Sequence, residues 1–405
     1  MGLQLARPRP CPVCDRIVTQ RFLRLRQVPV NCSALYHSAE RALGAPRGDI
    51  ELAACESCGM IFNAIFDPNQ LKYDTDYDNS LSYSPVFQAY ANELAERLVN
   101  TYDLRSKSIT EIGCGRGYFI NRLCELGANR GMGFDPAADP AQSTSTVTLV
   151  PALFASEHVS AADFVCCRHV LEHIPQPQQF LRLVRKSIAD RRGFAYFEVP
   201  NAECVLNGVT TWDLIYPHCS YFTAPSLRRL FDGCGFETVR IEPTFGGQFL
   251  GIEVRASSGR RNIASEAKSV ALVSRWVHRF DLRLRQSIFR WSRFIEYASV
   301  EGRGIVMWGA GAKGVTFLNV VPGSARVQAV VDVNPRKQGT FIPGTAQPVI
   351  APRDLGAYTP DVVLVLNPNY TTEIRRSVAE LSLSPHIAVT ADLPLPQNRF
   401  RAAAV

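Results

Sequence analysis

The sequence has no apolar run of the roughly 20 residues that a membrane-spanning helix needs. Its purely apolar stretches are short, as at 362–366. The N-terminal residues likewise hold no apolar core of the kind that a secretory signal carries. These absences predict a cytoplasmic protein with no membrane partner.

Positive charge is present but is not gathered into one patch. The 405-residue chain carries 44 lysines and arginines against 37 acidic residues, a net charge of +7. Its densest arginine run, 275–293, follows the helical pattern of a solvated helix face. This distribution argues against a nucleic-acid partner, and a mild positive field suits a small anionic substrate instead.

No segment repeats at the period of roughly 20–50 residues that marks a solenoid. The composition is that of an ordinary globular protein, with 46% hydrophobic and 20% charged residues. Such a chain can bury sizeable cores. Its length predicts two or three domains of about 150 residues each.

Cysteine is too sparse for a disulfide framework, yet it is unevenly placed. Five of the twelve cysteines precede residue 60, and four of these form two CxxC pairs with 40 residues between them. Two such pairs can converge tetrahedrally on Zn²⁺, and a site closed by four sulfurs would be structural. The predicted zinc ligands are Cys11, Cys14, Cys55 and Cys58, with Cys32 and His37 as alternatives between the pairs.

The order of apolar and amphipathic segments predicts an α/β fold. Short strands alternate with helical stretches from about 85 to 255, and again from 302 to 395. This alternation indicates mostly parallel sheets with helices on both faces. The segment 262–300 has few helix breakers and should form one or two bridging helices. The predicted division is a zinc-binding domain at 1–70, a central domain at 71–260, a helical linker at 261–301 and a C-terminal domain at 302–405.

A glycine-rich turn follows the first strand of the central domain and opens a helix. Residues 110–118 are Thr-Glu-Ile-Gly-Cys-Gly-Arg-Gly-Tyr, and Gly-Phe-Asp at 133–135 ends the next strand. The glycines let a ligand approach the backbone, and a carboxylate after the second strand can accept both ribose hydroxyls. This turn resembles the S-adenosylmethionine site of class I methyltransferases. A pyrophosphate would bind less well beside the negative charge of Glu111.

A second segment carries the same resemblance. Residues 163–174, Asp-Phe-Val-Cys-Cys-Arg-His-Val-Leu-Glu-His-Ile, resemble the fourth-strand region of class I methyltransferases. In that family the strand end borders the methionine part of the cofactor. We interpret His173 as a residue that fixes the loop rather than as a catalyst. The resemblance implies that S-adenosyl-L-methionine is bound by Glu111, Gly113, Cys114, Gly115, Gly117, Asp135, Cys167, Arg168 and His169.

The loop at 212–222 is dense in aromatic and polar residues. His218 is its best-placed titratable group, because an imidazole titrates near neutrality and can abstract a proton at physiological pH. A histidine packed for structure is the alternative interpretation. Tyr216 and Tyr221 could orient the base or stabilise an oxyanion. A tyrosine-rich segment at 73–83 could close over a cofactor as a lid, or simply link domains.

The C-terminal domain opens on a second glycine turn, Gly-Ala-Gly-Ala-Lys-Gly at 309–314, with Asp332 after the next strand. Taken alone, this pattern is a dinucleotide fingerprint. An NAD-binding oxidoreductase, or a non-catalytic module, is therefore the competing hypothesis. The helix after the turn is short for that role. Lys313 and the helix start could bind a phosphate or simply close the domain.

Cysteine pairs, a methyltransferase-like core and this C-terminal domain, in that order, resemble the tripartite sugar C-methyltransferases of deoxysugar biosynthesis. The resemblance covers nearly the whole chain and is most specific in the linked motifs at 306–319, 330–339 and 342–344. It implies a Rossmann-like C-terminal domain that helps to hold a nucleotide sugar without NAD.

The family chemistry implied by this resemblance begins with a ketone at C4 of the sugar. A base removes the neighbouring C3 proton, and the enolate attacks the methyl group of the cofactor, which requires close alignment of the three. The substrate would be a nucleotide-diphosphate-linked 4-keto-deoxysugar. The implied catalytic residues are His218, Tyr216 and Tyr77, and the implied substrate contacts are Tyr83, Tyr221 and Lys313.

One departure from the family concerns the base. The family pattern is Tyr-x-Glu-His, whereas this chain has Tyr216, Pro217 and His218, one residue shorter and without the glutamate. Proline offers neither charge nor proton. His218 therefore lacks a carboxylate neighbour unless Asp213 or Glu198 approaches it in space. The departure makes O- or N-methylation of a sugar-like acceptor the alternative to C-methylation.

Overall fold

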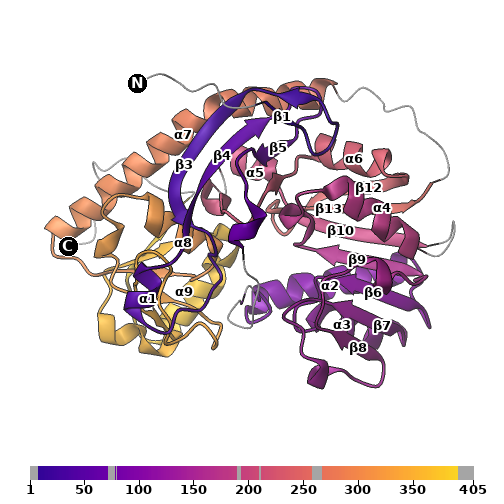
Figure 1. Ribbon diagram of the computed structural model, residues 1–405. Coiled ribbons are helices and arrows are strands. Elements are labelled where there is room, and N and C mark those ends of the chain that lie inside the picture. Colours follow the sequence, from indigo (N-terminus) through magenta and orange to yellow (C-terminus); the bar gives the residue numbers. More distant parts are fainter. Residues whose placement is uncertain are drawn as a thin grey trace.

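Two α/β bodies stand side by side under an arch in the computed structural model (Figure 1). The arch is formed by two long strands, β3 (Arg21–Pro29) and β4 (Arg47–Ala54), and by helix α7 (Ala267–Val300). The structure describes residues 8–71, 78, 80–188, 193–208, 211–257 and 267–390. Within these residues, no helix is both long and apolar enough to cross a bilayer.

The larger body is built on a seven-stranded sheet in the order β12-β13-β10-β9-β6-β7-β8. The strands from β10 to β8 in this order pair in parallel, and β13 runs antiparallel to both of its neighbours. Its strands are β6 (Ser108–Ile112), β7 (Arg130–Phe134), β8 (Val147–Val150), β9 (Phe164–Arg168), β10 (Phe194–Pro200), β12 (Phe236–Thr244) and β13 (Phe249–Ala256). Its helices are α2 (Pro85–Thr101), α3 (Tyr118–Gly127), α4 (Pro177–Ser187), α5 (Ala202–Leu206) and α6 (Ala224–Gly233).

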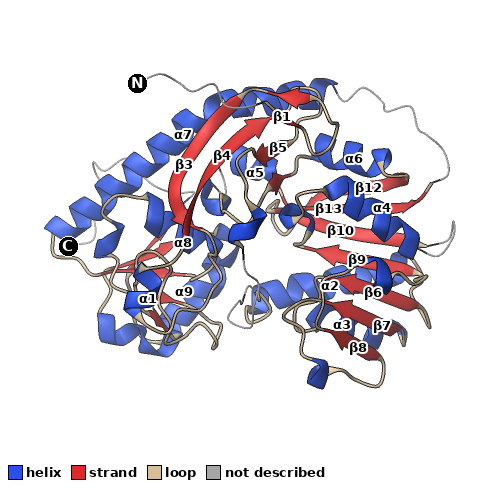
Figure 2. Cartoon of the chain, viewed as in Figure 1, coloured by secondary structure: helices blue, strands red, loops and turns tan. Residues whose placement is uncertain are grey.

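This strand order confirms the predicted α/β class, and it also locates a binding edge. The first strand of the sheet, β6, lies between β7 and β9, so the connections leave it in opposite directions. Ligands of such sheets bind beyond the carboxyl ends of the strands at this switch point. Figure 2 shows the helices that cover the faces of the sheet.

Helix α2 illustrates how local sequence sets an element. The side chain of Ser84 caps its first turn by accepting a hydrogen bond from the N–H of Phe87, and Pro85 occupies the first helical position, where no N–H is needed. Its buried residues recur at helical spacing and include Phe87, Ala91, Leu94 and Leu98. One apolar face therefore packs on the body and brings Tyr90 to the carboxyl edge of the sheet.

The N-terminal sheet takes in a strand from the middle of the chain. Its order is β11-β5-β4-β3, and all of its pairings are antiparallel. Strand β11 (Ser220–Tyr221) comes from the aromatic loop and pairs with β5 (Ile61–Asn63). Strands β1 (Arg9–Pro10) and β2 (Ile17–Val18) pair with each other in a separate two-stranded sheet, and helix α1 (Ala39–Leu43) lies between β3 and β4 in the chain. The loop that holds His218 is thus fixed to the N-terminal sheet.

The C-terminal body is a five-stranded parallel sheet in the order β16-β15-β14-β17-β18. The same switch point recurs between β14 and β17. The elements are β14 (Ile305–Trp308), α8 (Ala312–Val320), β15 (Val330–Val331), β16 (Val349–Ile350), β17 (Val362–Val365), α9 (Thr371–Glu380) and β18 (His386–Val389). This is the predicted Rossmann-like arrangement.

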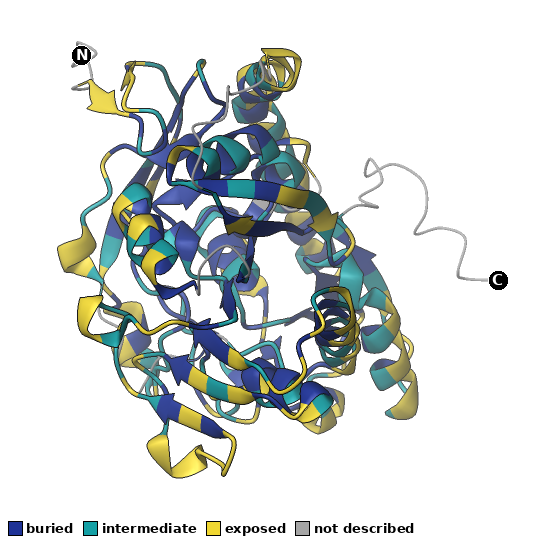
Figure 3. Ribbon diagram, turned by 90° about the vertical axis from the view of Figure 1, so that its right-hand side faces the viewer, coloured by how far each residue is buried: buried dark blue, intermediate teal, exposed yellow. Residues whose placement is uncertain are grey.

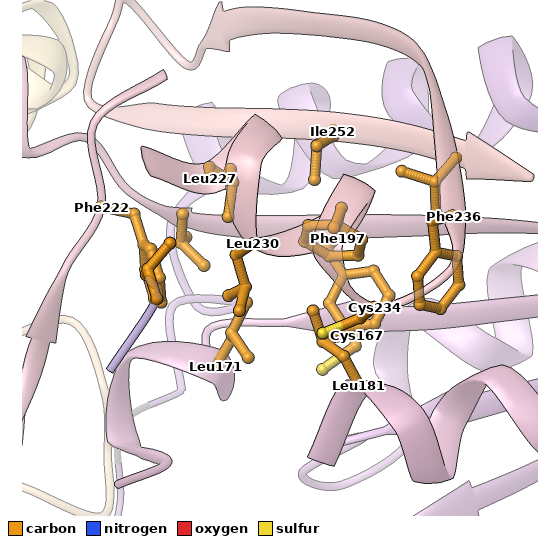
Figure 4. Packing of buried hydrophobic residues seen from close by; sticks show 14 of the residues in the cluster. Cys167, Leu171, Leu181, Phe197, Phe222, Leu227, Leu230, Cys234, Phe236 and Ile252 are labelled. Carbon is orange, nitrogen blue, oxygen red and sulfur yellow. The ribbon is translucent and has the colours of Figure 1, made fainter. Parts of the chain in front are cut away.

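Buried side chains from these parts pack together in shared clusters. Figure 3 marks the buried residues along the ribbon. Around Phe197, residues from α4, α6, β10 and β13 interdigitate (Figure 4), and the same cluster includes Cys11 and Cys58. A second cluster unites Trp212, Trp291 and Phe317, with ring centres 4.9 and 5.3 Å apart. These clusters combine residues from both sides of positions 70, 260 and 301. The domain limits placed there therefore stay a prediction.

Candidate active site

The predicted glycine turn lies at the switch point between β6 and β9. Gly113, Gly115 and Gly117 have φ angles of +77°, +53° and +83°, a region that favours glycine. A Cβ atom on Gly113 would come within 2.1 Å of Val170, so the turn packs directly on the loop after β9. A Cβ atom on Gly115 would meet nothing within 4 Å. The turn is therefore tightly packed on one side and open on the other.

Asp135, directly after β7, lies against this turn. Its two carboxylate oxygens accept hydrogen bonds from the backbone N–H groups of Gly115 (3.0 Å) and Ala137 (2.7 Å). Burial raises the pKa of Asp135, and these hydrogen bonds oppose the shift. The carboxylate thus stands at the turn, where a ribose is expected to bind.

Two buried groups beside the turn have polar atoms without a partner among the described residues. Glu111 is 2% exposed, and its Oε2 is unpartnered. Burial raises the pKa of Glu111 to about 7, against the attraction of the Arg168 charge. The guanidinium of Arg168 lies 4.3 Å from the ring centre of Phe119, and its Nη2 is unpartnered. A carboxylate and a guanidinium in this state complement an amino-acid zwitterion.

The two cysteines predicted in the cofactor site have buried side chains. Cys114 packs against Gly133, and Cys167 lies in the core shown in Figure 4. Only the backbone atoms of these two residues are therefore placed to line a ligand.

Glu198 on β10 is the centre of a buried hydrogen-bond network next to Arg168. Arg168 Nε donates to Glu198 Oε1 at 3.0 Å, and the hydroxyls of Tyr196 (3.0 Å), Thr244 (3.1 Å) and Tyr90 donate to Oε2. Burial disfavours the ionised form, but the Arg168 charge and the hydrogen bonds hold the pKa of Glu198 below its usual range. This network fixes the end of β9 against β10 and α2.

His169 follows β9 with a φ angle of +56°. Its Nε2 lies 3.1 Å from Glu198 Oε1, and its ring centre is 4.4 Å from that of Phe249. The predicted cofactor residue is therefore coupled to the Glu198 network.

His218 lies two residues before β11 and faces the loop after β9. One of its ring nitrogens, one of His173 and a carboxylate oxygen of Glu172 all lie within 4.8 Å of one another. His218 is 8% exposed, and its Nδ1 has no partner among the described residues. Burial lowers the pKa of His218, and the positive charges that His173, His169 and Lys313 can carry lower it further. A neutral imidazole of this kind can accept a proton near pH 7.

His173 and Glu172 belong to the short 3-10 helix η4 (Leu171–His173). His173 Nδ1 lies 3.1 Å from the carbonyl oxygen of Pro217, and because a carbonyl only accepts, Nδ1 carries the proton. Burial lowers the pKa of His173 to about 4. Sequence reasoning gave Glu172 no role, although its position just after the fourth strand places it at the binding edge.

The carboxylates offered from sequence as neighbours of His218 have other partners. Asp213 forms an ion pair with Lys313 at 2.7 Å, and Glu198 serves Arg168. Glu172 is the carboxylate that the structure brings to His218. The Asp213 pair also occupies the Lys313 ammonium that was expected to meet substrate.

The predicted tyrosines differ in where they lie. The hydroxyl of Tyr216 is 3.2 Å from the backbone nitrogen and 3.3 Å from the carbonyl oxygen of Asp67, so Tyr216 is fixed to the N-terminal segment. Tyr221 donates to the carbonyl of Ile215 (3.0 Å), with its ring centre 6.0 Å from that of His218. Tyr83 is half-buried in the turn before α2, and Tyr77 lies outside the described residues.

The four N-terminal cysteines of the CxxC pairs converge. Cys11 Sγ lies 3.6 Å from Cys58 Sγ, and Cys14 Sγ lies 3.6 Å from Cys55 Sγ. All four sulfurs are within 4.8 Å of one another. A disulfide would need about 2.05 Å, whereas tetrahedral zinc with Zn–S bonds of about 2.3 Å has sulfur–sulfur edges of about 3.8 Å. The cluster therefore has the dimensions of a zinc site.

Two family models match the chain in succession. A methyltransferase domain matches residues 86–241, and a C-methyltransferase C-terminal domain matches residues 255–384. The C-methyltransferase NovU of Streptomyces niveus is 25% identical over 349 residues, 80% of this chain and 81% of that protein. The ubiquinone biosynthesis O-methyltransferase of Aliivibrio fischeri is 26% identical over 151 residues, 33% of this chain and 64% of that protein.

Among solved structures, the 1,6-didemethyltoxoflavin-N1-methyltransferase of Burkholderia thailandensis is similar at 18% identity. The likeness covers 49% of this chain and 96% of that chain, with a TM-score of 0.35.

The methyltransferase match covers the glycine turn and the strands of the seven-stranded sheet except β13 and the end of β12. The chain is therefore an S-adenosylmethionine-dependent methyltransferase with a class I fold. A C-methyltransferase C-terminal domain model matches the residues that follow, and a C-methyltransferase aligns over 80% of the chain, so the chain is similar to C-methyltransferases along most of its length.

Proposed function

We propose that this enzyme methylates the carbon beside the ketone of a nucleotide-linked 4-keto-deoxysugar. The observation that carries the proposal is His218, a buried imidazole whose Nδ1 has no partner among the described residues, in a chain that matches a C-methyltransferase C-terminal domain. The sugar class follows from the resemblance of the linked C-terminal motifs.

S-adenosylmethionine, when bound, supplies an electrophilic methyl group on a positively charged sulfur. Its methionine part is a zwitterion, so its carboxylate suits Arg168 Nη2 and its ammonium suits Glu111 Oε2, the two unpartnered atoms beside the turn. Asp135 is proposed to hold the ribose hydroxyls. The backbone of residues 113–117 and 167–169 would line the rest of the site.

A hydrogen on the carbon beside a ketone is acidic because the ketone delocalises the negative charge that its removal leaves. In the proposal, Nδ1 of His218 accepts that proton. Burial favours the neutral imidazole that this step requires. Tyr216 would anchor the loop through Asp67. Tyr221 stays a candidate group for the enolate oxygen, and Tyr77 stays a catalytic candidate on the resemblance alone.

The nucleotide diphosphate would be the anionic partner that a net charge of +7 favours. Lys313 would reach a phosphate by exchanging Asp213 for it, and Tyr83 stays a candidate contact at the start of α2.

Methylation of oxygen is the second candidate. Pro217 stands where the family has a glutamate, and the methyltransferase domain is 26% identical to a ubiquinone biosynthesis O-methyltransferase. A hydroxyl acceptor would need the same base, but its carbon-bound hydrogens would stay in place.

Hydrogen exchange separates the two candidates. In heavy water, with S-adenosylhomocysteine and a thymidine diphosphate-linked 4-keto-6-deoxyhexose as the probe, the enzyme should exchange the hydrogen beside the ketone, as mass spectrometry would show. His218→Asn should slow this exchange at least about 100-fold. His278→Asn, on the exposed face of α7, should leave it unchanged. Methylation without carbon exchange would replace C-methylation by the oxygen alternative.

We also propose a structural Zn²⁺ at Cys11, Cys14, Cys55 and Cys58, supported by their sulfur–sulfur distances. Four thiolates would close the coordination shell and tie the two ends of the N-terminal zone together.

Removal of one ligand tests the zinc proposal. Cys55→Ser should lose about one equivalent of zinc in elemental analysis and should unfold at lower urea concentration. Cys32→Ser, at a buried cysteine that contacts Ser33 instead of the cluster, should keep its zinc. A Cys55→Ser protein with undiminished zinc would contradict the assignment.

A further inference from the structure

Two loops meet around His218 and are tied to each other twice. His173 Nδ1 donates to the carbonyl of Pro217 at 3.1 Å, and the thiol of Cys219 donates to the carbonyl of Glu172 at 3.3 Å. The residues on either side of His218 are thus bonded to Glu172 and its neighbour. These two hydrogen bonds hold the segments that carry Glu172 and His218 against each other.

Each of the two loops has a buried side-chain atom that lacks a hydrogen-bond partner among the described residues. Glu172 is 1% exposed, and its Oε2 has no partner among the described residues. The Nδ1 of His218 is in the same state. The carboxylate and the imidazole have atoms within 4.8 Å of each other, a gap that one hydroxyl group or one water molecule spans. Buried polar atoms of this kind are rare unless they serve a ligand or a reaction.

We propose that Glu172 is the carboxylate partner of His218 and takes the place of the glutamate that Pro217 removes from the loop. This inference rests on the proposed function. Glu172 acts through His218 and is a positioning residue: its charge stabilises the imidazolium that forms when Nδ1 takes the proton from carbon. No bond to Glu172 forms or breaks, and the proton stays on His218 until it returns to solvent or product.

The charges around Glu172 define how the pair should respond to pH. His169 Nδ1 lies 3.9 Å from Glu172 Oε1, His173 and His218 face it across the gap, and the Glu198 charge is close enough to oppose its ionisation. Burial raises the pKa of Glu172 to about 8. The ionised form that supports His218 therefore grows as pH rises through about 8, and proton abstraction should accelerate over the same range.

The test is the pH profile of hydrogen exchange with the thymidine diphosphate-linked probe and S-adenosylhomocysteine. Wild-type exchange should rise between about pH 7 and about pH 9. Glu172→Gln should lose that rise and slow exchange at the upper end by about 100-fold. Glu172→Asp, which keeps a carboxyl group, should be slower than wild type but should retain the rise. Glu253→Gln, at a buried glutamate bonded to Arg97 and Tyr102, should resemble wild type.

The possible outcomes separate this inference from the function on which it rests. A Glu172→Gln enzyme that keeps the pH-dependent rise, while His218→Asn abolishes exchange, overturns the role of Glu172 and leaves C-methylation intact. A wild-type enzyme that methylates without exchange at carbon removes the proposed function and this inference with it. Retained S-adenosylhomocysteine binding in calorimetry shows that the Gln variant is folded.

A measurement on the wild-type protein covers the case in which the Gln variant does not fold. The ¹⁵N signal of the His218 ring, assigned by its loss in His218→Asn, should shift as Glu172 titrates near pH 8. A signal without an inflection there overturns the proposal.

Discussion

The enzyme contains two glycine turns on two sheets with the same switch point, and the turns differ in how far their polar groups are satisfied. In both, the strand after the turn is followed by an aspartate that accepts a hydrogen bond from the turn: Asp135 from Gly115 at 3.0 Å, and Asp332 from Ala310 at 2.8 Å. The two turns thus share the same backbone arrangement.

The surroundings of the two turns are opposite. The first turn has Glu111 Oε2 and Arg168 Nη2 buried without partners among the described residues. At the second turn, Lys337 donates to the carbonyl of Ala310 at 3.2 Å, and at 309–314 and Asp332, all described, no buried side-chain nitrogen or oxygen lacks a partner. A buried unpartnered group costs about 1–3 kcal/mol. The first turn keeps that cost until a charged ligand binds, whereas the buried side-chain atoms of the second turn already have partners within the chain.

The largest expected effect comes from the cation at each site. Arg168→Met leaves Glu198 buried without its counter-ion and should destabilise the enzyme by about 3–5 kcal/mol in urea unfolding. It should also abolish S-adenosylhomocysteine binding in calorimetry. Lys313→Met removes the cation of the Asp213 pair at the second turn, whose side chains are 13% and 12% exposed, and should cost about 1–3 kcal/mol with cofactor affinity unchanged. Equal losses of affinity would erase the contrast between the turns.

The carboxylates come next in expected size. Glu111→Gln should weaken S-adenosylhomocysteine binding about 10- to 100-fold, because a hydrogen bond to a charged group contributes about 1.5–3 kcal/mol. Asp332→Asn should leave that affinity at the wild-type value, and neither protein should bind NAD. Calorimetric titration measures both. NAD binding that disappears in Asp332→Asn would restore the dinucleotide interpretation of the second turn.

Glu111 also predicts a pH dependence of stability. Its pKa rises from an ordinary value near 4.5 to about 7 on folding. The folded state then holds the proton more tightly, so stability falls as pH rises through this window. Glu111→Gln lacks this proton and should gain stability relative to wild type between about pH 4.5 and about pH 7. Urea unfolding at both limits provides the measurement, and a constant difference between the proteins would contradict it.

The smallest effect should come from Lys337. Lys337→Met removes one hydrogen bond from the second turn and should lower stability by about 1 kcal/mol, with no change in cofactor affinity or methyl transfer. Urea unfolding and calorimetry together measure it. A loss of cofactor affinity would show that the two turns are coupled.

The fold could be predicted because its evidence is local. The alternation of strands and helices, together with the two glycine turns, predicts parallel sheets without any knowledge of how the loops fold. The cofactor turn is likewise contained in a few consecutive residues, from Glu111 to Gly117. The spacing of four cysteines in two CxxC pairs likewise predicts that their sulfurs lie close together.

The acceptor side could not be predicted in the same way, because its contacts join segments far apart in the chain. Glu172 and His218 are brought together by two loops, and nothing local shows that Pro217 bonds to His173. Tyr216 and His218 are two positions apart, yet the hydroxyl of Tyr216 lies at Asp67. The direction of a side chain in an irregular loop is set by packing against distant segments, not by sequence neighbours.

The pairing of β11 with β5 has a consequence for protein engineering. The two residues that follow the His218 loop complete a sheet whose other strands belong to the first 63 residues. A methyltransferase domain cut out at residue 71 would keep its cofactor turn but lose the edge that fixes the base. Exchange of this domain between related enzymes should therefore transplant acceptor chemistry only when the N-terminal sheet travels with it.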